Sequence, residues 1–140
     1  MPDSPVLQVG SAVAALVLAA VFCYAAVAKL SDRQRTAEDF LSMGLPDPGR
    51  LAILVPLLEL GTAACLVVAP GWGGVLAVAL LVGFTTNLVL VMRSGRVATC
   101  ACFGGSSAEP ISVGHLIRNA GLGALGLLSA LFDGWIWQVL

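Results

Sequence analysis

Composition and the spacing of charged residues predict an all-α membrane protein, a bundle of four transmembrane helices with short loops. The 140 residues are 59% hydrophobic and 11% charged, with a mean hydropathy of +0.97, whereas about a quarter of the residues in a soluble domain are charged. A water-soluble fold of this length could not bury so much apolar surface. The net charge is −1, and the sequence has no basic stripe or glycine-rich phosphate loop. The lipid bilayer is therefore an expected partner, and nucleic acid is not.

The first membrane span is expected over residues 6–30. No residue that is charged at neutral pH lies between Asp3 and Lys29, and as a helix this run would be roughly 37 Å long, more than the hydrocarbon core of about 30 Å. A cleaved signal peptide is the alternative, but the segment lacks a basic start and its apolar run is long. We interpret it as a retained span.

The other spans are predicted from the positions at which charges and turn residues interrupt the apolar sequence. Between Arg50 and Arg93 the single charge is Glu59, and the segment 70–74, Pro-Gly-Trp-Gly-Gly, predicts a turn that divides this stretch in two. A further apolar segment follows the third connection. Within a single domain covering 1–140, the spans after the first are expected over 51–69, 74–92 and 111–132.

Lysine and arginine residues gather in two of the predicted connections. They are Lys29, Arg33, Arg35 and Arg50 around the first connection, and Arg93 and Arg96 at the third. With four spans, both basic connections lie on one face of the membrane. The positive-inside rule predicts that this face is cytoplasmic and that both termini lie on the other side.

The connection between the third and fourth spans carries Cys100 and Cys102. Two thiols separated by one residue can close a small, strained disulfide ring that is easily reduced, which suits a pair that cycles. The same thiolates could hold Cu(I) or contribute to a zinc site, and they could also be incidental loop cysteines. No second Cys/His pair stands at a usual ligand spacing. Redox chemistry is therefore favoured, and no residue is assigned to a metal.

Two further cysteines, Cys23 and Cys65, lie inside predicted spans, where small buried cysteines commonly fill space between helices. Counting the helical rise places Cys23 roughly 10 Å from the basic face and Cys65 near the opposite face, so the two are not expected to pair. Cys23 remains a candidate third thiol that could reach the loop pair.

Ionisable residues inside the predicted spans are candidates for function, because a charge within the bilayer is costly and usually faces a partner. Glu59 must be protonated or paired with a base such as Arg118 or Lys29. On the fourth span, His115, Arg118 and Asn119 fall on one helical face near the basic end. These residues are therefore expected to lie close to the cysteine loop.

Tyr24 and Asn87 sit at a comparable depth on the first and third spans. All these polar residues would then form one pocket beneath the thiols, in which positive charge favours the thiolate form of a cysteine. The alternative is that they join helices by hydrogen bonds, and for Asn87 this interpretation is favoured.

Two sets of motifs resemble a known group of membrane proteins. The stretch Ala26–Asp32 with Leu58–Gly61 is similar to the DoxX-like membrane proteins. The segment Cys100–Gly104, followed by His115–Asn119, looks like the methylamine utilisation protein MauE branch of that group. The combination of Cys-x-Cys-Phe-Gly with a following Arg-Asn is fairly specific, and the resemblance covers nearly the whole chain.

The resemblance implies a four-helix bundle in the bacterial inner membrane that is associated with thiol redox chemistry. It implies that Cys100 and Cys102 form a redox pair, which acts with a thioredoxin-like partner in the maturation of a disulfide-containing protein such as periplasmic methylamine dehydrogenase. A periplasmic partner conflicts with the orientation that the charges predict. The supporting pattern implied by the resemblance comprises Lys29, Glu59, Arg118 and Asn119.

The leading hypothesis from the sequence is a membrane thiol–disulfide oxidoreductase or relay. His115 and Arg118 would favour the thiolate, and a quinone in a pocket near Glu59 is the candidate electron carrier. A non-catalytic Cu(I)-binding protein and an accessory subunit of a membrane complex are the alternatives. Because short spans leave much helix surface facing lipid, a homo-oligomer is also considered.

Overall fold

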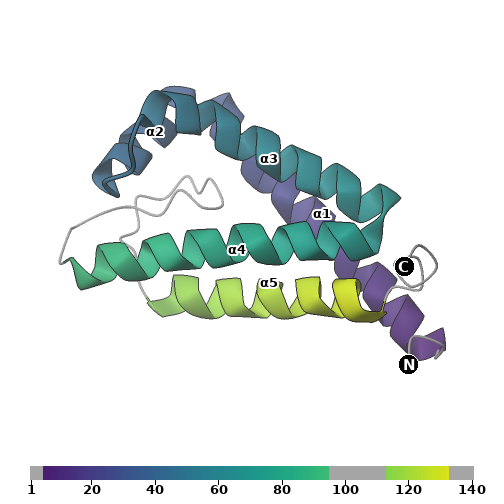
Figure 1. Ribbon diagram of the computed structural model, residues 1–140. Coiled ribbons are helices and arrows are strands. Elements are labelled where there is room, and N and C mark those ends of the chain that lie inside the picture. The colour runs from purple at the N-terminus through teal and green to yellow at the C-terminus, as the bar shows by residue number, and fades with distance from the viewer. Residues whose placement is uncertain (1–4, 95–112, 133–140) are drawn as a thin grey trace.

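A computed structural model describes residues 5–94 and 113–132 and shows a bundle of helices (Figure 1). Within these residues there are five helices and no strand. The expected all-α bundle is thereby confirmed. The helices are α1 (Pro5–Ser31), α2 (Arg33–Ser42), α3 (Pro48–Val68), α4 (Pro70–Arg93) and α5 (Val113–Phe132).

Three helices in the described part of the chain, α1, α3 and α4, are long and apolar enough to cross a membrane. The chain is therefore a multi-pass membrane protein. The α5 helix, of 20 residues, is not among these three, and its first turns carry His115, Arg118 and Asn119. A membrane crossing by α5, and with it the count of four spans, stays a prediction.

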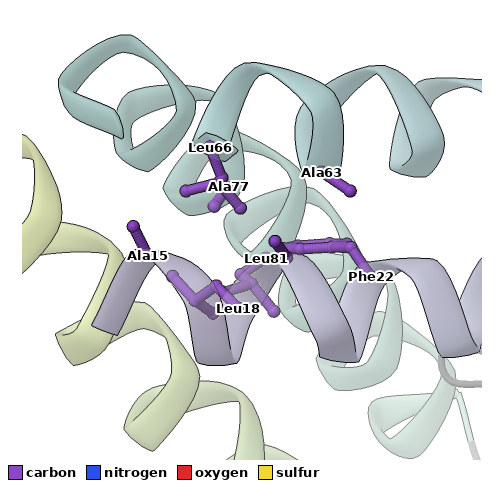
Figure 2. Packing of buried hydrophobic residues seen from close by; sticks show 8 residues of the cluster. Ala15, Leu18, Phe22, Ala63, Leu66, Ala77 and Leu81 are labelled. Atoms are coloured by element: carbon purple, nitrogen blue, oxygen red, sulfur yellow. The ribbon is translucent and has the colours of Figure 1, made fainter. Parts of the chain in front are cut away.

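The core lies where α1, α3 and α4 meet (Figure 2). On α1 the inward residues recur every three or four positions, as Ala15, Leu18 and Phe22 do, which is the period of one helical face. The opposite face of the same helix exposes apolar side chains such as Leu16, which is 60% exposed. Apolar residues on both faces are expected of a helix that packs inward on protein and outward on lipid.

The chain reverses between α3 and α4 at Ala69 alone, so the turn predicted at 70–74 is wrong. These five residues instead form the first turns of α4. Pro70 suits the first helical position because its missing N–H would have no partner there. A Cβ on Gly73 would lie 2.5 Å from the Cα of Leu66, so only glycine allows the two helices to meet this closely.

Where α1 begins and α5 ends, hydrogen bonds join them to the α3–α4 reversal. Ser129 Oγ donates to the Pro70 carbonyl at 2.8 Å, and Ser11 Oγ donates to the Ser129 carbonyl at 3.5 Å. Next to them, a Cβ on Gly74 would lie 2.6 Å from the Gly126 carbonyl oxygen. We call this end of the bundle the turn end. Here α4 and α5 touch backbone to backbone.

The opposite end, which we call the basic end, carries Lys29 and Arg93 in the last turns of α1 and α4. It also contains α2, which the sequence analysis did not predict. Phe40 and Met43, at the close of α2, pack against Val91 near the end of α4. The two basic connections of the chain therefore start from the same end of the bundle, as the predicted orientation requires.

Local signals explain why the α2 segment is a helix. The Asp32 side chain caps its first turn by accepting a hydrogen bond from the Arg35 N–H at 3.1 Å. At the other end Gly44 has a φ of +77°, and Leu45 N–H donates to the Phe40 carbonyl at 3.1 Å. A left-handed glycine with this hydrogen bond is a Schellman motif, which ends a helix and turns the chain.

Candidate functional site

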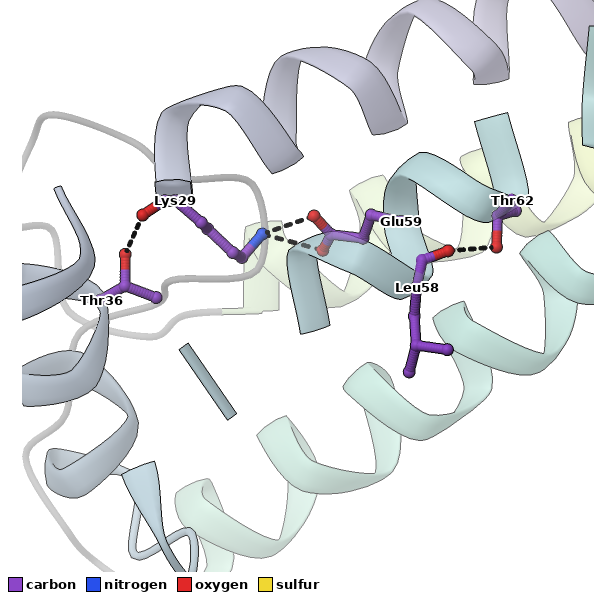
Figure 3. A network of polar contacts seen from close by, with 5 residues as sticks. All are labelled: Lys29, Thr36, Leu58, Glu59 and Thr62. Atoms are coloured by element: carbon purple, nitrogen blue, oxygen red, sulfur yellow. Dashed lines mark hydrogen bonds and ion pairs between the residues drawn. The ribbon is translucent and has the colours of Figure 1, made fainter. Parts of the chain in front are cut away.

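Among the described residues, an ion pair between α1 and α3 is buried inside the mostly apolar bundle. Lys29 Nζ lies 2.9 Å from Glu59 Oε1 and 3.2 Å from Oε2, and both side chains are 0% exposed (Figure 3). Glu59 is in the middle of α3, roughly 16 Å along the helix from Pro48. From the sequence, Glu59 was expected to be protonated or paired with Arg118 or Lys29, and in the structure it pairs with Lys29.

Pairing is what allows these two charges inside the bundle. A single charge in the hydrocarbon region is strongly disfavoured, and burial in protein adds a desolvation cost. Here both carboxylate oxygens accept hydrogen bonds from one ammonium group, which offsets that cost. The pair therefore joins α1 to α3.

A third element, α2, is attached at the same place. Thr36 Oγ1 lies 3.2 Å from the Lys29 carbonyl (Figure 3). The same hydroxyl lies 3.0 Å from the Asp32 carbonyl. Below α2 is an apolar cavity of about 170 Å³, and Lys29, Met43 and Asn87 are among its lining residues. Asn87 Nδ2 lies 3.7 Å from Met43 Sδ. This contact between α4 and the end of α2 agrees with the interpretation of Asn87 as a residue that joins helices.

The polar residues of α5 face two different neighbours. Asn119 is 2% exposed, and its Nδ2 donates to Thr85 Oγ1 of α4 at 3.1 Å. Arg118 instead lines a shallow groove between α5 and α1, where Tyr24 is 67% exposed on the outer side of α1. His115 is half-buried. Of the residues predicted to share one polar pocket, Tyr24 and Arg118 line the same groove, whereas Asn119 contacts Thr85 and Asn87 contacts Met43.

Cys100 and Cys102 lie outside the described residues. The other two cysteines are free thiols, with Cys23 exposed and Cys65 half-buried. The expectation that both fill buried space is wrong for Cys23, because its side chain is on the outer face of α1. Cys65 Sγ lies 4.0 Å from the Ala69 carbonyl, which places it at the turn end as expected. Within residues 5–94 and 113–132, no three His, Cys, Asp or Glu residues are close enough to hold a metal ion.

Sequence reasoning missed two threonines that complete these contacts. Thr36 belongs to the unpredicted α2, whose Asp32 cap and Gly44 terminator are readable in the sequence. Thr85 begins the run Thr85-Thr86-Asn87 inside an otherwise apolar span. Such a run of three polar residues was the available signal, although it did not reveal that Thr85 contacts Asn119.

These features define a class of protein, a small multi-pass α-helical membrane protein whose helices are joined by a buried lysine–glutamate pair. The chain belongs to the family of the methylamine utilisation protein MauE, whose family model matches residues 7–132. This match confirms the resemblance seen in the sequence. Searches of the curated proteins and of the solved structures found no match to this chain.

Proposed function

We propose that this protein is a thiol–disulfide redox protein of the bacterial inner membrane and that Cys100 and Cys102 are its exchanging pair. The observation that carries the proposal is the Cys-x-Cys spacing, which lies inside the region matched by the MauE family model. The segment with these cysteines joins α4 to α5. The described residues that precede it, at the end of α4, lie at the basic end, where Val91 packs against Phe40 and Met43.

The proposed reaction is an exchange with a thioredoxin-like partner. In the reducing direction, one thiolate of the pair attacks a disulfide sulfur of the partner, so that a mixed disulfide forms and a partner thiolate leaves. The second thiolate then attacks the mixed disulfide, and the internal Cys100–Cys102 bond forms as the partner is released with both thiols reduced. Two electrons move from this protein to the partner, and the reverse sequence oxidises the partner.

The remaining site residues have supporting roles in this proposal. Lys29, in the last turn of α1, pairs with Glu59 in the middle of α3 and so joins these two helices. Arg118 and His115 lie in the first turns of α5, directly after the segment, and a positive charge from Arg118 would favour the thiolate. Cys23 is a third thiol that could resolve a mixed disulfide, and its exposure on α1 agrees with this role. Maturation of a disulfide-containing protein, as in methylamine metabolism, is the proposed purpose.

The redox state of the pair can be read by gel-shift alkylation of native membranes. The variant Cys23→Ser/Cys65→Ser retains Cys100 and Cys102 as its only thiols. A large maleimide that does not cross the bilayer is added to right-side-out and inverted vesicles, with and without prior reduction. The control adds Cys100→Ser and Cys102→Ser to the same background and must show no shift.

The proposal requires that both cysteines become modifiable together, and only after reduction. The vesicle orientation that responds identifies the compartment of the partner, which resolves the conflict between the basic loops and a periplasmic partner. If both cysteines react freely without reductant and Cu(I) protects them, the redox function is overturned in favour of copper binding.

A further inference from the structure

A groove of about 400 Å³ lies between α4 and α5, which run side by side in Figure 1. Its walls are mostly apolar, including Val78, Val82 and Leu127. Val82 is 59% exposed and Leu127 is 51% exposed, so the rim of the groove is on the outer surface of the bundle. In a membrane protein this opening faces lipid, and an occupant would enter from the bilayer.

One buried polar residue lines this apolar groove. Asn119 is 2% exposed and its Nδ2 donates to Thr85 Oγ1, but its Oδ1 is buried and accepts no hydrogen bond within the part of the chain that the structure describes. A buried acceptor without a donor is destabilising, more so in an apolar setting. Both Asn119 and Thr85 line the groove. The arrangement therefore suits an occupant that brings its own O–H or N–H.

The asparagine–threonine pair can serve a ligand in two hydrogen-bonding states. In the observed arrangement the amide oxygen is available to accept from a ligand hydroxyl. If the side-chain amide of Asn119 rotates so that Oδ1 and Nδ2 exchange places, the Thr85 hydroxyl donates to Oδ1. Nδ2 is then available to donate to a ligand carbonyl. A molecule that alternates between carbonyl and hydroxyl at one position matches both arrangements.

We infer that this groove binds the ring of a lipid-soluble quinone or quinol, with one ring oxygen at Asn119 and the apolar tail along Val82 and Leu127. The choice of a redox-active ligand rests on the function proposed above, whereas the binding of a hydroxyl or carbonyl head rests on the groove itself. Thr85 and Asn119 are roughly 12 Å and 9 Å from the helix ends at Arg93 and Val113, counted by helical rise. The ring would therefore lie near the basic end.

This placement differs from the pocket near Glu59 that the sequence suggested. Both carboxylate oxygens of Glu59 are bonded to Lys29. The groove, by contrast, retains an unused acceptor. In the overall reaction the dithiol loses two electrons and two protons as the S–S bond forms, and the quinone gains them as its two carbonyls become hydroxyls.

Two glycine substitutions on α5 can distinguish a loss of ligand binding in the groove from a loss of folding. A Cβ added at Gly123 or at Gly121 meets no atom within 4 Å, so the bundle tolerates a larger side chain at either position. Gly123 lines the groove, whereas Gly121 is exposed on the same helix and does not line it. Gly123→Leu therefore fills the groove, and Gly121→Leu is its matched control.

Binding is measured with a radiolabelled short-chain quinone and its quinol on the full-length protein in lipid nanodiscs. Gly123→Leu is expected to weaken binding of both forms at least tenfold, and Gly121→Leu to change it less than twofold. Thr85→Val and Asn119→Leu should each weaken binding several-fold, whereas Thr85→Ser and Asn87→Leu should not. Equal binding by Gly123→Leu and Gly121→Leu overturns the inference.

Two further experiments identify the ligand and test the binding site independently of the proposed thiol exchange. Phosphatidylethanolamine and phosphatidylglycerol also carry N–H or O–H donors, so displacement of the quinol by either lipid at equimolar amounts would show a lipid site and overturn the quinone assignment. The variant Cys100→Ser/Cys102→Ser should bind both forms normally. If the unaltered protein binds the quinone but shows no thiol exchange, the proposed function is wrong and the binding site is still supported.

Discussion

The α1–α3 contact and the α4–α5 contact both bury polar side chains, but they satisfy them differently. Between α1 and α3, Lys29 and Glu59 are 0% exposed and each carboxylate oxygen has a partner. Between α4 and α5, Asn119 uses its donor on Thr85 and leaves a buried acceptor over a groove. In the first contact the two charged side chains hydrogen-bond to each other, whereas the second leaves one buried acceptor without a donor among the described residues.

The distance between α4 and α5 also varies along their length. At the turn end Gly74 and Gly126 bring α4 and α5 into backbone contact, and the groove opens further along the same pair of helices. A tight crossing at one end and a gap near the other create a pocket without any bend or loop. The ion pair therefore matches two buried charges between α1 and α3, whereas the α4–α5 groove is the proposed place where the bundle accepts a ligand.

The largest effect is expected from breaking the ion pair on one side. Glu59→Leu leaves the Lys29 ammonium buried without its carboxylate, and removing one partner of a buried pair costs about 3–5 kcal/mol. The double variant Lys29→Met/Glu59→Leu removes both charges and should be near neutral or more stable. Unfolding of the three proteins in one detergent compares these free energies.

The exposed pair of Arg50 and Asp47 is the control for this experiment. Their side chains are 82% and 59% exposed at an N–O distance of 3.3 Å, so Asp47→Asn should change stability by less than about 1 kcal/mol. The prediction is contradicted if the double variant loses as much stability as Glu59→Leu. That result would show that the attraction between Lys29 and Glu59 itself stabilises the fold.

A smaller loss is expected at the glycine contact of α4 and α5. Gly74→Ala places a methyl group 2.6 Å from the Gly126 carbonyl oxygen, and overpacking of this kind typically costs about 1–3 kcal/mol. Gly83→Ala on the same helix meets nothing within 4 Å, so it should be neutral or slightly stabilising because alanine favours helix. Unfolding midpoints of both variants test this, and equal midpoints would contradict the close contact.

The smallest effect concerns the attachment of α2. Thr36→Val keeps the shape of the side chain but removes the hydroxyl that contacts the Lys29 and Asp32 carbonyls, which should cost about 1 kcal/mol. The loss should appear as faster hydrogen exchange in residues 33–42. The control is Thr86→Val, because the Thr86 hydroxyl donates to the Val82 carbonyl within α4, and it should leave exchange in α2 unchanged. Unaltered exchange in the Thr36 variant would show that apolar packing alone holds α2.

The membrane class, the main helices and the need for a base near Glu59 were all readable from the sequence, because each follows from the cost of a charge in an apolar environment. The sequence did not reveal α2, since its charged residues resemble those of a basic loop unless the Asp32 cap and Gly44 terminator are weighed. It also misplaced the reversal at 70–74, because Pro-Gly is equally suited to the first turn of a helix.

Which polar residues meet could not be predicted, because that depends on how each helix is rotated about its axis. Arg118 and Asn119 are neighbours in sequence, yet one lies toward α1 and the other toward α4. Spacing alone placed both in one pocket with Tyr24 and Glu59. Only the packing of α5 against its two neighbours separates them.

The most direct test of thiol exchange is to trap the mixed disulfide with the partner. In a Cys23→Ser/Cys65→Ser background, Cys100→Ser and Cys102→Ser are each made singly, so that the remaining thiol cannot be resolved within the pair. We predict that one of the single variants accumulates a covalent complex with a thioredoxin-like protein that disappears on reduction and is absent from the variant lacking both cysteines. If neither single variant forms a complex that the double variant lacks, the protein is not a thiol–disulfide redox protein.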